Sequence, residues 1–149
     1  MVNLETARVS LTSSQENYLK TICMEVSQNG YAKMSDIADL LSVKKSSVNA
    51  ALNVLADKNL INYKPYSQIT LTPLGFKKAK EIIKRFEVMY NFFCEILKLS
   101  REEAVANSCR MEHAMSEELF RRIDKFCEFT KEVYGNDPNY RKRLDELLS

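Results

Sequence analysis

Residues 34–58 read MSDIADLLSVKKSSVNAALNVLADK and contain two apolar helical patterns separated by a short turn. The first pattern predicts a helix over 36–41. The second predicts a helix over about 45–58, because apolar side chains recur from Val48 to Leu55 at the i, i+3, i+4, i+7 spacing of one helix face. Two helices joined by so short a turn predict a helix-turn-helix. An αα-hairpin with a polar outer face is the alternative.

The outward face of the second helix carries side chains suited to DNA. Short hydrogen-bonding groups at a helix N-terminus, beside two lysines, fit the major groove. The segment 44–80 has seven Lys or Arg against one Asp or Glu, although the net charge of the chain is only +2. A basic segment of this kind points to a polyanion partner. The candidate DNA-contacting residues on this helix are Lys44, Lys45, Ser46, Ser47, Asn49 and Asn53.

Residues 60–71, LINYKPYSQITL, follow this helix directly. Two short β-prone runs flank a turn that contains a proline, which predicts a β-hairpin. A hairpin placed directly after a recognition helix is the wing of a winged helix. At its tip, Lys64 and Tyr66 are candidates for contact with phosphates or the minor groove.

The rest of the chain is expected to be helical. Three glycines and three prolines in 149 residues indicate few breaks, so the fold class is mainly α. Capping boxes are predicted at Ser13 with Glu16 and at Ser100 with Glu103, and Ser35 is a candidate cap for the helix at 36–41. The further helices are expected over about 13–29, 73–98, a short segment from 100, a segment from about 105 to 135, and 140–148.

The segment Cys109-Arg110-Met111-Glu112-His113 carries a candidate metal site. On a helix, Cys109, Glu112 and His113 have i, i+3, i+4 spacing and project from one face. A thiolate, a carboxylate and an imidazole are metal ligands of mixed hardness. The alternative is a helix with a buried cysteine, a solvated glutamate and an incidental histidine. The remaining cysteines form no CxxC pair and are interpreted as core residues; they are Cys23, Cys94 and Cys127.

With these motifs in place, the chain resembles the diphtheria toxin repressor and manganese transport regulator family of metal-dependent transcription factors. The resemblance covers nearly the whole chain, and its most specific part is the run from Cys109 to Ser116. The other matching runs are Glu16-Asn17-Tyr18-Leu19, Met34-Ser35-Asp36-Ile37-Ala38, the hydroxyl-rich helix after Lys44, and Leu71-Thr72-Pro73-Leu74-Gly75.

The resemblance implies a homodimer with a winged-helix DNA-binding domain at 1–72 and a helical dimerisation and metal-binding domain at 73–149. The resemblance is to the short form of the family, so the SH3-like domain of longer members is not expected. Cys109, Glu112 and His113 match the regulatory metal site of the family. The ligand that the family places on its first helix falls on Asn17, whose amide oxygen ligates more weakly than a carboxylate.

Four other family ligand positions carry different residues here. They are Lys20, Phe86, Tyr90 and Val105. A protonated lysine, an aromatic hydrocarbon and an aliphatic side chain do not bind metal. We therefore expect the second metal site of the family to be lost.

The leading functional prediction is a DNA-binding regulator, and a repressor of metal-homeostasis genes, that senses one divalent transition metal. The donor set favours Fe²⁺, Zn²⁺, Co²⁺ or Ni²⁺ over Mn²⁺. Fe²⁺ is the leading candidate, and Zn²⁺, Co²⁺, Ni²⁺ and Mn²⁺ are the further ones. The alternative is a winged-helix dimer with a vestigial metal site that answers another signal. An enzyme is disfavoured, because the chain has no second histidine, nucleophile elbow or Gly-rich phosphate loop. A protein-interaction module that uses the helix at 73–98 is a third class.

The expected partners are double-stranded operator DNA and a second copy of the chain. No apolar run approaches the length of a membrane span, and residues 1–10 lack the pattern of a signal peptide. We therefore expect a cytoplasmic protein.

Overall fold

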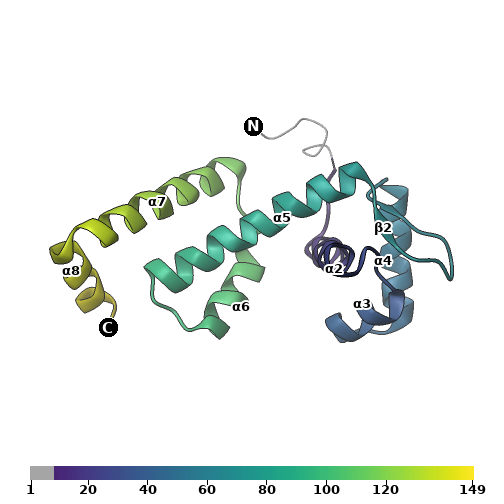
Figure 1. Ribbon diagram of the computed structural model, residues 1–149, viewed down its shortest axis with the longest axis horizontal. Coiled ribbons are helices and arrows are strands. Elements are labelled where there is room, and N and C mark those ends of the chain that lie inside the picture. The colour runs from purple at the N-terminus through teal and green to yellow at the C-terminus, as the bar shows by residue number, and fades with distance from the viewer. Residues whose placement is uncertain (1–8) are drawn as a thin grey trace. The chain divides into compact units, whose positions relative to one another are not determined.

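A computed structural model describes residues 9–149 (Figure 1). These residues form helices and one small hairpin, so the mainly α prediction is confirmed. The chain divides into two compact units, one ending at Ile83 and one beginning at Lys84. The elements are α2 Ser13–Asn29, α3 Met34–Leu41, α4 Lys45–Asp57, β1 Ile61–Asn62, β2 Thr70–Leu71, α5 Pro73–Asn91, η1 Phe92–Ile96, α6 Arg101–Met111, α7 Glu117–Asn136 and α8 Pro138–Leu148.

The first unit is built around one apolar core. The inner faces of α2, α3 and α4 and the wing strands meet there, and their central side chains are fully buried. Burial of a Leu or Ile side chain contributes about 1.5–3 kcal/mol, so this core accounts for the docking of α3 against α4. The largest of its fully buried residues are Leu19, Ile22, Ile37, Leu52, Leu55, Leu60 and Ile69.

The helix boundaries in this unit correct two sequence predictions. The capping box of α2 is formed by Thr12 and Gln15, one residue before the predicted pair: the Thr12 hydroxyl accepts from the Gln15 amide, and the Gln15 side chain accepts from the Thr12 amide. Ser35 does not cap α3, because that helix begins at Met34 and its N-cap is Lys33. Ser35 lies inside the first turn, and its hydroxyl donates to the carboxylate of Asp36.

The predicted wing is confirmed as an antiparallel hairpin of β1 and β2. Ile61 pairs with Leu71, and Ala32 adds an isolated bridge to Ile69. Where the hairpin returns to α5, a Cβ at Gly75 would overlap the carbonyl oxygen of Leu60. Only glycine permits this close approach of backbone to backbone. The first turn of α5 can therefore lie this close to Leu60 only with a glycine at position 75.

The second unit departs from the prediction at its centre. A single helix was expected from about 105 to 135, but α6 ends at Met111 and α7 begins at Glu117. The hydroxyl of Ser116 accepts from the amide of Leu119 and caps the new helix. Two glutamates in the first turn of α7 add a favourable interaction with the helix dipole. Because of this local N-terminal signal, two helices form where the continuous apolar pattern predicts one.

The other helix ends differ by smaller amounts. The predicted helix over 73–98 turns into the π-helical segment η1 after Asn91. α8 begins at Pro138 instead of Tyr140, because the Asp137 carboxylate accepts from the backbone amides of Asn139 and Tyr140. Among the described residues, no helix combines the length and apolarity needed to cross a membrane. The core of this unit is centred on Met89, Phe93, Ala104 and Met115.

Candidate DNA-binding face and metal centre

A groove of about 740 Å³ lies between α4 and the wing. One side comes from the first turns of α4 and the other from the hairpin turn, with the start of α3 at one end. Its lining includes two lysines and several hydrogen-bonding Ser, Asn and Gln side chains, which is the chemistry that meets phosphates and base edges. Its lining residues are Lys33, Met34, Ser35, Lys45, Ser46, Asn49, Tyr63, Pro65, Tyr66, Ser67 and Gln68.

The eight predicted DNA-contacting side chains are all exposed. Four of them line the groove; these are Lys45, Ser46, Asn49 and Tyr66. The other four lie outside it on the same two elements, with Lys44 as the N-cap of α4. Their contact with DNA stays a prediction.

Sequence reasoning missed the residue that links the two sides of the groove. The hydroxyl of Tyr63, just after β1, donates a 2.7 Å hydrogen bond to Oδ1 of Asn49 on α4. One turn further along α4, Nδ2 of Asn53 donates to the backbone oxygen of Asn49 at 3.0 Å. The only sequence signal for Tyr63 was its place in a β-prone run, and that signal does not identify its partner.

The tip of the wing is a tight turn that its own side chains hold. The amide of Ser67 donates to the carbonyl oxygen of Lys64 at 3.1 Å, and the Ser67 hydroxyl donates to the same oxygen at 2.7 Å. Tyr66 has a φ of 63° and a fully exposed ring. Such a left-handed residue projects its side chain away from the turn, where a DNA backbone can reach it.

The candidate metal ligands lie where α6 ends. Cys109 is half-buried on α6, Glu112 is the C-cap, and His113 is exposed in the turn that follows. A carboxylate oxygen of Glu112 and a ring nitrogen of His113 lie within 4.8 Å of each other. The Glu112 side chain is only 2% exposed, and a carboxylate in so buried a place requires a positive or hydrogen-bonding neighbour. Carboxylates and imidazoles are both ligands of divalent cations. A divalent cation bound by Glu112 and His113 therefore fits this place.

Arg85 holds this ligand turn against α5. Its Nη1 donates to the backbone oxygens of Glu112, at 3.2 Å, and of Met115, at 3.1 Å. Its Nη2 pairs with the Glu117 carboxylate at 2.6 Å, and its guanidinium lies 5.4 Å from the centre of the Phe120 ring. The guanidinium therefore satisfies carbonyls that the end of α6 leaves without helical partners. Nothing in the sequence pattern indicated this role.

Aromatic rings occupy two of the family ligand positions on α5. The rings of Phe86 and Tyr90 are stacked with centroids 6.2 Å apart. Hydrogen bonding to Cys94 raises the pKa of the Tyr90 phenol above its usual value, so the phenol stays neutral. The third position, Val105, is 43% exposed on α6. A neutral phenol is a poor metal ligand, and the side chains of Phe86 and Val105 have no donor atom.

The metal-ligand position that the family has on its first helix is Asn17 in this chain, and Asn17 belongs to the other compact unit. Asn17 is exposed on α2, and its backbone oxygen accepts from the hydroxyl of Thr21. Lys20 is half-buried on the same helix. The participation of Asn17 in a metal site stays a prediction.

The cysteines outside the candidate metal site have different surroundings. All four cysteines are free thiols. Cys23 and Cys127 are buried, as predicted for core residues, and Cys94 is half-buried. Burial raises the pKa of the Cys127 thiol, which keeps it protonated and unreactive.

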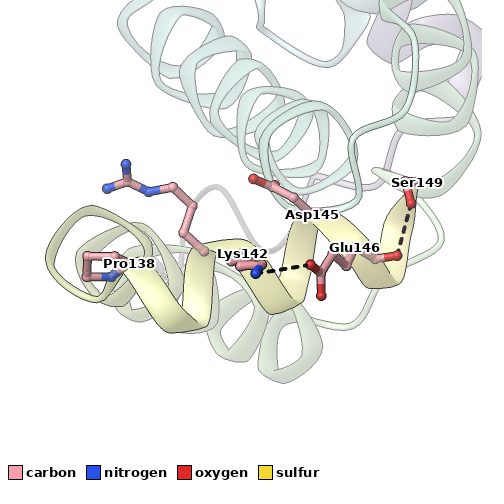
Figure 2. A pocket seen from close by; sticks show the side chains of 6 residues that line it. Pro138, Lys142, Asp145, Glu146 and Ser149 are labelled. Atoms are coloured by element: carbon pink, nitrogen blue, oxygen red, sulfur yellow. Dashed lines mark hydrogen bonds and ion pairs between the residues drawn. The ribbon is translucent and has the colours of Figure 1, made fainter.

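A shallow hollow along α8 carries no candidate site (Figure 2). Its lining residues come from one helix and the chain end, and their polar groups contact one another: Lys142 pairs with Glu146 at 3.8 Å, and the Ser149 hydroxyl donates to the Glu146 backbone oxygen. Arg141 donates hydrogen bonds to two carbonyl oxygens at the end of α7, and the Asp145 carboxylate accepts a hydrogen bond from the Tyr134 hydroxyl.

Two family models match this chain in succession. Residues 10–69 match the N-terminal DNA-binding domain of iron-dependent repressors. Residues 72–141 match the metal-binding and dimerisation domain of the same repressors. Together the two matches cover the helix-turn-helix, the wing apart from β2, the long helix α5 and the ligand segment.

Individual relatives agree with the family models. An HTH-type transcriptional regulator of Methanocaldococcus jannaschii is 33% identical over 123 residues, which are 82% of this chain and 98% of that protein. The HTH-type transcriptional regulator MntR of Lysinibacillus sphaericus is 30% identical over 134 residues, 90% of this chain and 93% of that protein. The crystal structure of T. acidophilum IdeR superposes with a TM-score of 0.66 at 27% identity; the match covers 78% of this chain but 54% of that one, so this chain spans about half its length.

Proposed function

The chain belongs to the iron-dependent repressor family of metal-dependent, DNA-binding transcriptional regulators, and we propose that it represses metal-homeostasis genes through one metal site per chain. The observation that carries the proposal is the groove between α4 and the wing, lined by Lys45, Ser46 and Asn49, in a chain that also places buried Glu112 beside His113. The first feature suits an operator, and the second suits a divalent cation.

We assign DNA binding to residues 1–72 and dimerisation and metal binding to 73–149. The bounds of the matched family domains, 10–69 and 72–141, support this division. In the DNA complex, α4 enters the major groove and the wing tip contacts the backbone. Lys44, Lys45 and Lys64 are assigned to phosphates, while Ser46, Ser47, Asn49 and Asn53 are assigned to base edges.

We further propose that the chain works as a homodimer. α7 exposes three large apolar side chains, Leu119, Phe126 and Phe129, each about half exposed. Their i, i+7, i+10 spacing places them on one face of the helix. A cluster of exposed apolar residues marks an interaction surface, and a second copy of the chain is the occupant that a dimerisation domain requires. Because its partner is operator DNA, we place the protein in the cytoplasm.

The proposed metal ligands are Cys109, Glu112 and His113, with Asn17 of α2 as a further oxygen donor. A thiolate and an imidazole favour Fe²⁺, Zn²⁺, Co²⁺ or Ni²⁺ over Mn²⁺, and we propose Fe²⁺ as the physiological metal. One cation is expected per chain, because Phe86 and Tyr90 stack at the other family positions.

A titration tests these assignments. The purified protein is stripped with a chelator and its DNA affinity is measured with each of the five metals, beside metal analysis. We expect tighter binding with metal, reversal by chelator, and loss of the response in His113→Ala without loss of the dimer. A wild-type protein that binds DNA equally well with and without metal supports the second candidate function, a winged-helix dimer with a vestigial site. The aromatic pair on α5 is the observation that favours this second candidate.

A further inference from the structure

The contact between Tyr63 and Asn49 joins the wing to the outward face of α4. The Tyr63 ring is half-buried and packs against the core of the first unit. Its hydroxyl extends from that core and donates to Oδ1 of Asn49 at 2.7 Å, a normal length for an O–H···O hydrogen bond. The ring is held by packing, so the position of the hydroxyl is fixed by the fold.

This hydrogen bond decides which end of the Asn49 amide is available to a ligand. An asparagine side chain has an acceptor oxygen and a donor NH₂ at opposite ends of one plane. Tyr63 occupies a lone pair of the oxygen, and the NH₂ group then points to the other side. Within residues 9–149, the Nδ2 of Asn49 has no hydrogen-bond partner, and the side chain is exposed at the groove.

We propose that Tyr63 is a positioning residue for DNA recognition, which orients Asn49 so that its NH₂ group reads an acceptor on a base edge. This inference rests on the proposed function, because it requires α4 to enter the major groove. The acceptors in that groove are N7 and O6 of guanine, N7 of adenine and O4 of thymine. An asparagine that reads adenine needs its oxygen for N6 and its NH₂ for N7. With the oxygen held by Tyr63, a G·C pair is favoured over an A·T pair, because guanine places two acceptors side by side whereas adenine places a donor beside its N7.

The neighbouring asparagine supplies a contrast on the same helix. Nδ2 of Asn53 donates to the Asn49 backbone oxygen, so Asn53 directs its own oxygen away from the helix. Asn49 therefore offers a donor and Asn53 an acceptor, although the two side chains are chemically identical. The sequence alone cannot distinguish them.

The test is a selection of operator sequences from a random duplex library, with the full-length protein and whichever metal gives the tightest binding. The base pair read by residue 49 is identified as the one whose preference disappears in Asn49→Ala. Wild type is expected to require a G·C pair there. Tyr63→Phe keeps the packed ring and removes only the hydroxyl, which frees the amide to rotate. We expect its discrimination at that base pair to fall about tenfold, with other positions unchanged.

Tyr31→Phe is the control, because Tyr31 lies in the same compact unit, does not line the groove, and its hydroxyl has no hydrogen-bond partner among the described residues. It should leave the selected sequence unchanged. Thermal unfolding confirms that both variants fold. Two results overturn the inference: an unchanged profile for Tyr63→Phe, or a wild-type requirement for an A·T pair at the position read by Asn49. If wild type selects no sequence at all, the proposed function itself fails and the inference fails with it.

Discussion

Replacing Arg85 with methionine removes the group that holds the ligand turn but keeps the apolar stem. The variant loses two hydrogen bonds from a charged donor to the backbone oxygens of Glu112 and Met115, together with the ion pair to Glu117. Hydrogen bonds to charged groups contribute about 1.5 kcal/mol or more each. The Arg85 side chain is 24% exposed and Glu117 is 53% exposed, so the ion pair adds at most about 1 kcal/mol.

We therefore expect Arg85→Met to lower the free energy of unfolding by about 3 kcal/mol. For a chain of this size, the corresponding fall in Tm is roughly 6–12 °C. Metal affinity should also fall, by about tenfold, because the backbone that carries Glu112 and His113 is no longer held in one position. Thermal unfolding in chelator measures the first effect, and titration of the stripped protein with Co²⁺ measures the second.

The control is the neighbouring residue on α5. Lys84 pairs with Asp124 at 3.4 Å, but its side chain is 63% exposed, so Lys84→Met should change the stability by less than about 1 kcal/mol. If Arg85→Met matches Lys84→Met in both Tm and Co²⁺ affinity, the guanidinium does not hold the ligand turn and our reasoning about Arg85 is refuted.

Five other substitutions test the fold and the two candidate sites. Gly75→Ala should destabilise the first unit by several kcal/mol or prevent folding, because the added Cβ would overlap the Leu60 carbonyl oxygen. The control is Gly135→Ala on α7, where a Cβ meets no other atom, and this variant should be neutral or stabilising. Thermal unfolding measures both effects. Cys109→Ala should abolish the S-to-Co charge-transfer band in the absorption spectrum of the Co²⁺ protein, and a retained band excludes this thiolate as a ligand. Lys45→Ala should reduce the slope of log affinity against log salt concentration by about 1. Ser47→Ala should change the base preference more than this slope. If the two variants change slope and base preference alike, the assignment of Lys45 to a phosphate and Ser47 to a base is wrong.

Much of the fold follows from patterns that the chain carries locally. The apolar spacing in α4 and the turn before it predict a helix-turn-helix, and the β-prone runs around Pro65 predict the wing. Thr72 and Pro73 mark the start of α5, where the Thr72 hydroxyl accepts from the amide of Gly75. These signals are readable because a cap, a turn or an amphipathic face depends on residues within one or two helical turns of one another.

The break between α6 and α7 shows where local patterns compete. The apolar spacing continues past Met115, so periodicity alone predicts one helix through the ligand segment. Ser116 and the glutamates after it form an equally local N-terminal signal, and the structure follows that signal. As a result, His113 lies in a turn and not on the helix face that the i, i+4 spacing implied.

The amino-acid sequence by itself determined the fold class, the helix-turn-helix with its wing, and which residue types gather at residues 109–113. Only the tertiary structure decided which side chains meet. Tyr63 and Asn49 are 14 residues apart, and Arg85 lies 27 residues from Glu112. No periodicity or capping rule connects residues at such separations, because their contact depends on how two packed elements bring the side chains together. The orientation of the Asn49 amide and the support of the ligand turn are therefore properties of packing, and the sequence encodes them only through the fold as a whole.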